Sequence, residues 1–179
     1  MNFWSEKPEF WKSRIAGNAT YQKQKAELVQ DIADIKKTFG IQTVLDVGGY
    51  RGELGLSLPK GLKYRSLDLV NGFDITKPWA SQGLVKQPHT LALTSLVAIV
   101  LSPSDLLATI DQMQKNADYL LFYEELYDGR HYNGEKISED YGGKWNHDIR
   151  SYLPELVAIT TIPSQANEHW ERIFVGGIL

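Results

Sequence analysis

The residues best placed to do chemistry lie where an apolar segment containing an acid runs into glycines. The segment 43–47 holds Asp46 among valine and leucine, and Gly48, Gly49 and Gly52 follow it. A strand that is covered on both faces is continuously apolar. Glycines beyond such a strand let the backbone turn sharply and approach a ligand closely. Because ligands of open α/β sheets bind at the carboxyl ends of the strands, residues 46–52 are predicted to form a small-molecule site.

This spacing resembles the first motif of class I S-adenosylmethionine (SAM)-dependent methyltransferases, in which an acid precedes glycines at alternate positions. Asp46, Gly48 and Gly52 match the motif, and Tyr50 stands where its middle glycine is expected. The dinucleotide fingerprint G-x-G-x-x-G fits in no frame, because Tyr50 or Arg51 falls on its second glycine. An ordinary tight turn between a strand and a helix is the alternative that the spacing leaves open.

A second acid, Asp68, ends the predicted strand 64–69 and lies 22 positions beyond Asp46. Nucleotide-binding βαβ units place an acid about 20 residues on, where it accepts hydrogen bonds from ribose hydroxyls. Asp68 is therefore expected to hold the ribose, although a solvated strand end is the alternative. The resemblance implies that Asp74 and Ile75 flank the adenine.

The resemblance also places the family's fourth motif at residues 93–97. Many members carry an Asp or Asn there, in contact with the methionine part of the cofactor or with the substrate. This chain has Thr94 and Ser95 instead. Thr94 is therefore a candidate cofactor contact, through a neutral hydroxyl that can position a group but is a weak base.

The polar, glycine-rich segment 127–150 follows the predicted strand 119–124 and is expected to overhang the same rim as an inserted substrate loop. Its aromatic rings offer a flat wall and a face for a cation, which suits substrate binding. The candidate substrate-binding residues are Tyr132, Tyr141 and Trp145.

Two histidines in this segment, His131 and His147, are candidate general bases, because histidine titrates near neutral pH. Two other interpretations stay open: His147 and its neighbours could cap a helix that begins near residue 149, and His131 could be a solvated loop residue. No spacing of His, Asp and Glu defines a metal triad, so no metal site is expected.

The elements that must position these residues alternate between helix and strand. Apolar residues recur at helical spacing over residues 21–39, and Ser102 and Pro103 supply the cap and first turn of another helix. Residues 156–163 and 170–178 predict a terminal hairpin. Strands are predicted at residues 43–47, 64–69, 90–101 and 119–124, and the first and last of these are expected to be buried.

The chain from residue 69 to residue 73 has no room for a crossover helix of about a dozen residues. The sheet is therefore expected to be reduced beside the strand 64–69, with Asp74 and Ile75 in a strand stub or a loop. The predicted fold class is α/β: a three-layer, Rossmann-like, mostly parallel twisted sheet with a C-terminal antiparallel strand. Class I methyltransferases characteristically end their sheet in this way, and the resemblance covers residues 20–179.

Composition limits the other function classes. The 179 residues suit a single domain over 1–179, in which residues 1–19 are expected to form an N-terminal cap or lid. The net charge of −3 and the lack of a basic track argue against a nucleic-acid partner. The longest apolar run is too short to span a bilayer, and no secretion signal is evident, so a cytoplasmic location without a membrane partner is expected.

The absence of two features also favours a small-molecule substrate over DNA. The chain has no cysteine, which excludes the cysteine mechanism of cytosine-C5 methylation, and no Asn/Asp-Pro-Pro-Tyr/Phe signature of DNA amino-methylases. The resemblance thus implies SAM-dependent O- or N-methylation of a small-molecule acceptor such as a sugar or metabolite. The alternative is a non-catalytic SAM-binding or interaction protein with the same fold. The sequence predicts no oligomeric state.

Overall fold

The computed structural model describes residues 18–127, 129–138, 143–153 and 158–176. The expected cap or lid over residues 1–19 lies outside these residues except for its last two positions. None of the helices in the described ranges is both long and apolar enough to cross a membrane. The helices are α3 (Ala19–Phe39) and α4 (Pro103–Asn116), and the strands are β1 (Thr43–Val47), β2 (Lys63–Leu67), β3 (Thr90–Ser95), β4 (Tyr119–Glu125), β5 (Glu135–Ser138), β6 (Lys144–Asn146), β7 (Ala158–Pro163) and β8 (Trp170–Gly176).

Six strands form the central sheet in the order β2-β1-β3-β4-β8-β7. The first four are parallel, whereas β8 is antiparallel to both β4 and β7. Val47 pairs with Leu67 on one side and with Thr94 on the other. This register brings the carboxyl ends of β1, β2 and β3 to one edge, which confirms the predicted mostly parallel sheet with its antiparallel end.

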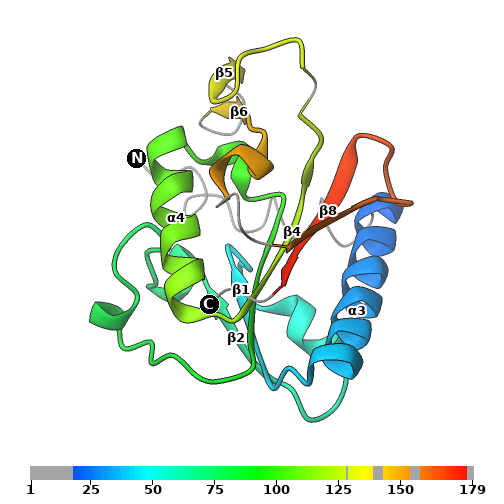
Figure 1. Cartoon of the computed structure of the whole chain (residues 1–179), viewed down its shortest axis with the longest axis vertical. Coiled ribbons are helices and arrows are strands. Elements are labelled where there is room, and N and C mark those ends of the chain that lie inside the picture. Colours follow the sequence, from blue (N-terminus) through cyan, green and yellow to red (C-terminus); the bar gives the residue numbers. More distant parts are fainter. Residues whose placement is uncertain (1–17, 128, 139–142, 154–157, 177–179) are drawn as a thin grey trace.

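Helix α3 covers one face of this sheet (Figure 1). The Asn18 side chain caps its first turn by accepting a hydrogen bond from the Thr20 amide at 2.9 Å. Gly40 ends it in the left-handed conformation, with φ of 69°. The helix buries Leu28, Ile32 and Ile35 against the sheet, as the helical spacing predicts.

Helix α4 covers the opposite face, so the domain has three layers (Figure 1). Ser102 caps this helix at the Asp105 amide, and Pro103 occupies its first turn. Leu106, Ile110 and Met113 face the sheet in a second apolar cluster. Because alternate residues of a strand point to opposite faces, each parallel strand contributes to both clusters.

The sheet is reduced beside β2, as the sequence predicts. Residues 68–89 contain only short 3₁₀ turns and no α-helix. Trp79 fills part of the space: it is fully buried, its indole N–H donates to the Ile75 carbonyl at 3.0 Å, and its ring meets Phe73 edge-on. Asp74 and Ile75 lie in a turn rather than in a strand stub.

Two predicted segments differ in the structure. The strand predicted over 90–101 ends at Ser95, because Leu96 adopts a left-handed conformation and a 3₁₀ turn, η4 (Ala98–Val100), follows. The segment 127–150, predicted as a loop, contains the antiparallel hairpin of β5 and β6, which lies beyond the end of β4 (Figure 1). Residues 128 and 139–142 of this segment lie outside the described ranges.

The buried tryptophan provides a test of this packing. Trp79→Ala removes a fully buried ring and its hydrogen bond, so we expect the free energy of unfolding to fall by about 3–5 kcal/mol. Val85→Ala, at a side chain that is 72% exposed, is the control and should change it by less than about 0.5 kcal/mol. Urea denaturation measures both. Equal losses in the two variants would contradict the assigned packing.

Candidate functional site: the rim of the parallel sheet

The glycine turn after β1 is fixed by its backbone geometry. Gly48 and Gly52 have φ of 75° and 79°, and the Gly48 amide donates to the Leu67 carbonyl of the neighbouring strand at 2.8 Å. Tyr50, at the position of the missing glycine, has φ of 50°. Tyr50 thus adopts a left-handed conformation that costs a non-glycine residue about 1 kcal/mol or more. The turn thus has positive φ at positions 48, 50 and 52, although only the first and last of these are glycine.

Asp68 compensates for this conformation by bonding to the turn. Its Oδ2 accepts a hydrogen bond from the Tyr50 amide at 3.0 Å, and its Oδ1 accepts one from the Val70 amide at 2.9 Å. The Tyr50 carbonyl accepts hydrogen bonds from the side chains of Ser66 and Asn71. The glycine turn is therefore attached to the end of β2. Because the Asp68 carboxylate is only half-buried and each of its oxygens can accept more than one hydrogen bond, it keeps capacity for a ligand hydroxyl.

Asp46 lies beneath the turn and is only 4% exposed. Tyr64 donates its hydroxyl to the Asp46 carboxylate at 2.5 Å. A Cβ on Gly49 would lie 2.4 Å from the carboxylate carbon, so only glycine fits over this acid. Burial raises the pKa of Asp46 to about 6, the Tyr64 hydrogen bond opposes that shift, and the charge of Asp68 adds to it. The two acids thus lie within electrostatic reach of each other.

The other predicted cofactor residues are Asp74, Ile75 and Thr94, and each lies in an environment of its own. Asp74 accepts hydrogen bonds from the amide and hydroxyl of Thr76, so its carboxylate stabilises its own turn. Ile75 is 8% exposed and belongs to the core on the α4 side. Thr94 is buried, and its hydroxyl makes no regular hydrogen bond among the described residues.

Glu124 lies at the end of β4, and the sequence places it near the glycine turn but assigns it no role. Its side chain is 1% exposed, and its two carboxyl oxygens accept hydrogen bonds from the Val97 and Ala98 amides at 3.2 and 3.1 Å. Burial raises its pKa to about 8, while the nearby Thr94 hydroxyl and the two amides oppose that shift. The only sequence signal was an acid that ends a buried strand, the same signal that marks Asp46 and Asp68.

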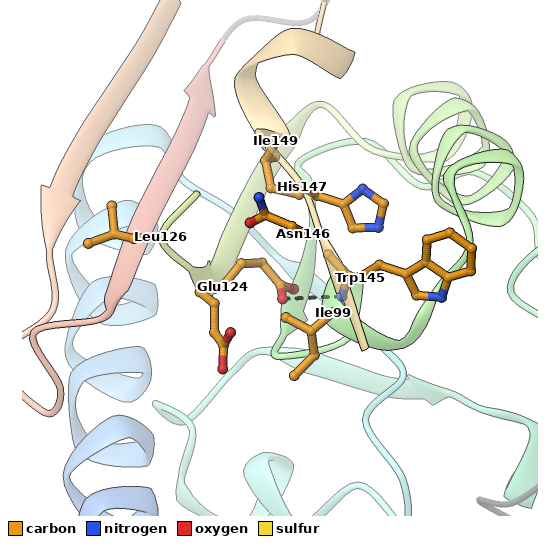
Figure 2. A pocket seen from close by; sticks show the side chains of 9 residues that line it. Ile99, Glu124, Leu126, Trp145, Asn146, His147 and Ile149 are labelled. Carbon is orange, nitrogen blue, oxygen red and sulfur yellow. Dashed lines mark hydrogen bonds between the residues drawn. The ribbon is translucent and has the colours of Figure 1, made fainter. Parts of the chain in front are cut away.

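A small cavity separates Glu124 from the β5–β6 hairpin (Figure 2). It has room for about one water molecule. Trp145 of β6 lines it together with Asn146 and His147. A second hollow, of about 300 Å³, lies near the amino ends of β1, β2 and β3, at the edge of the sheet opposite the glycine turn.

Both ring nitrogens of His147 are hydrogen-bonded to other groups of the protein. Nε2 lies 2.9 Å from the Leu101 carbonyl, which can only accept, so we assign the ring proton to Nε2. Nδ1 then accepts the Tyr152 hydroxyl at 3.0 Å. Burial lowers the pKa of this imidazole. In this arrangement neither nitrogen is free to take a proton from a substrate, and the ring points away from Glu124 (Figure 2).

The other predicted residues of the substrate loop are more open. His131 is exposed, with its Nδ1 3.5 Å from a Glu135 carboxylate oxygen. Tyr132 is 85% exposed, and Tyr141 lies outside the described residues. No group of His, Asp and Glu in the described part of the chain is arranged to hold a metal ion.

Comparison with solved structures identifies this arrangement of strands. The mitomycin 7-O-methyltransferase MmcR superposes with a TM-score of 0.63 at 17% identity, over 99% of this chain and 61% of the other. Magnesium protoporphyrin IX methyltransferase (ChlM) from Synechocystis PCC 6803, solved with bound SAH, gives 0.62 at 14% identity, over 98% and 97%. A SAM-dependent methyltransferase from Leishmania major gives 0.67 at 14% identity, over 97% and 79%.

The chain has the class I methyltransferase fold. At these identities the likeness concerns the fold alone, and the chain spans about three fifths of the mitomycin enzyme's length. No protein-family model and no curated protein matches the sequence.

The raised pKa of Glu124 predicts a pH-dependent stability. A carboxyl whose pKa rises from 4.5 to about 8 on folding stabilises the folded state most below pH 4.5, and this contribution is lost as pH rises through 8. We expect the free energy of unfolding to fall by about 2 kcal/mol between pH 6 and pH 8. Glu124→Gln should remove most of that fall in urea denaturation at pH 6, 7 and 8. Glu125→Gln, the neighbouring acid paired with Lys144, should retain it; a slope unchanged in Glu124→Gln would contradict the assignment.

Proposed function

We propose that the protein is a SAM-dependent methyltransferase that acts on a small-molecule acceptor by O- or N-methylation. The observation that carries this proposal is the rim itself. The chain has a class I fold, and Asp68 binds the backbone of its glycine turn at the Tyr50 amide. Position 49 of this turn has room only for glycine, because a larger residue would clash with Asp46. This combination of half-buried carboxylate and bare main chain suits an adenosyl amino acid.

The proposed cofactor contacts fall at the ribose, the methionine part and the adenine. Asp68 has lone pairs left to accept the ribose hydroxyls, and Gly48 and Gly49 allow the methionine part to approach the backbone. From the family resemblance we propose Asp74 and Ile75 as the residues that flank the adenine. Thr94, which is buried, is the proposed contact for the methionine part of the cofactor through its hydroxyl.

Methyl transfer from SAM needs little chemical participation from side chains. A bound sulfonium supplies the activated methyl group, and the protein contributes chiefly by aligning donor and acceptor. The proposed acceptor contacts are Trp145, which lines the small cavity, the exposed Tyr132, and Tyr141. Because both nitrogens of His147 are engaged, His131 is the proposed base if the acceptor must lose a proton.

One observation favours a second function, SAM binding without methyl transfer. The residue closest to the rim cavity that could have served as a neutral-pH base, His147, is used to anchor the chain. A binding protein would need the same glycine turn and the same Asp68. Methyl transfer from radiolabelled SAM to a panel of amino sugars and hydroxylated metabolites separates the two functions.

Calorimetric titration with SAM tests the cofactor assignment. Asp68→Asn replaces one acceptor oxygen by a donor, and the loss of charge-assisted hydrogen bonds should weaken SAM binding about tenfold or more. Asp148→Asn is a matched control, because Asp148 caps another 3₁₀ turn in the same way, by accepting from the Arg150 amide.

We expect Asp148→Asn to bind SAM as the unmodified protein does. Absence of SAM binding to the unmodified protein at millimolar concentration would overturn the proposal. Equal affinities of Asp68→Asn and Asp148→Asn would overturn the role given to Asp68.

A further inference from the structure

The chain after β3 reverses through a backbone conformation that needs support. Leu96 has φ of 55°, which is unfavourable for a residue with a branched side chain. Its own amide donates to the Tyr123 carbonyl at 2.8 Å, which extends the pairing of β3 with β4. The next two amides, of Val97 and Ala98, then point away from the ladder of the sheet and toward Glu124.

Glu124 is the acceptor that satisfies both amides. One oxygen binds Val97 and the other binds Ala98, in a region where Val97, Ala98 and Glu124 are each less than a tenth exposed. A buried amide without a partner costs about 1–3 kcal/mol, so removing this acceptor would favour a different path for the segment. The adjacent acid cannot replace it, because Glu125 is bonded to Lys144 at the surface of the rim.

Val97 transmits this constraint to the glycine turn. A Cβ built on Gly48 would lie 2.5 Å from one Val97 methyl carbon and 3.0 Å from the other. The Val97 side chain therefore packs directly on the Gly48 backbone, where φ is 75°. No free space separates the two loops, so a displacement of Val97 has to be accompanied by a displacement of Gly48 or by the loss of their contact.

We infer that Glu124 is a positioning residue for the cofactor turn: by holding the amides of Val97 and Ala98 it keeps Val97 packed against Gly48. This inference rests on the proposed function in so far as Gly48 belongs to a SAM site. It assigns to the end of β4 a role that acts on the cofactor through the backbone of the loop after β3. Glu124 itself need not touch the cofactor or the acceptor.

Amide hydrogen exchange tests the inference without any ligand. Glu124→Gln keeps the size of the side chain but turns an NH₂ group toward one of the two amide donors. We expect exchange at Val97 and Ala98 to accelerate at least tenfold, and exchange at Gly48 and Gly49 to accelerate with it. Glu125→Gln is the matched control at the next residue and should change none of these four amides.

SAM affinity gives the second measurement. Glu124→Gln and Val97→Ala should each weaken SAM binding about fivefold or more. The SAM affinity of the double variant should be only slightly below that of the single variant with the lower affinity. Such non-additivity is expected if both residues act through one contact with Gly48. Val97→Ala removes only two methyl groups, so it reports on the contact even if Glu124→Gln fails to fold.

The possible outcomes are distinct. Faster exchange confined to Val97 and Ala98, with Gly48 and Gly49 unchanged, would overturn the inference, as would fully additive losses of SAM affinity. If the unmodified protein binds no SAM, the proposed function fails, while the exchange of Gly48 in Glu124→Gln still decides whether Glu124 positions the turn.

Discussion

The hydrogen bond from the Tyr50 amide to the Asp68 carboxylate is the interaction on which the rim of this sheet depends. Tyr50 occupies a left-handed conformation that glycine would adopt at no cost, and the turn keeps that path because a carboxylate accepts its amide. The Gly48 amide adds a second bond to the same neighbouring strand. Without these bonds the turn would have no reason to lie over Asp46, and the glycines would not be presented at the edge of the sheet.

The same physical solution recurs around the rim. Glycine-rich turns expose amides that no secondary structure satisfies, and a buried amide must find an acceptor. Asp68 and Glu124 each accept from two backbone amides, at the ends of β2 and β4. At Glu124 the cost of this arrangement is desolvation of the carboxyl, which raises its pKa to about 8. Acids that appear to be ligand contacts are therefore also the framework of the site.

The sheet lacks a crossover α-helix beside β2, and buried aromatic side chains fill the core there instead. No α-helix crosses between β2 and β3, yet Trp79 and Phe73 pack into the apolar cluster that α4 covers on the same face. The class I arrangement is kept at sequence identities of 14–17% to the three solved methyltransferases compared above. A parallel sheet with both faces covered is specified by the pattern of apolar residues more than by their identities.

Local sequence determined most of the fold. Helical spacing and capping residues fixed α3 and α4, and apolar runs that contain or end in acids fixed β1 and β4, because these signals act over a few residues. Only the tertiary structure decided what the side chains bond to. Nothing near His147 in sequence indicates that it meets the Leu101 carbonyl, and nothing near Glu124 indicates the amides of Val97 and Ala98. Those partners lie 26–46 residues away along the chain, and the packing of the sheet brings them together.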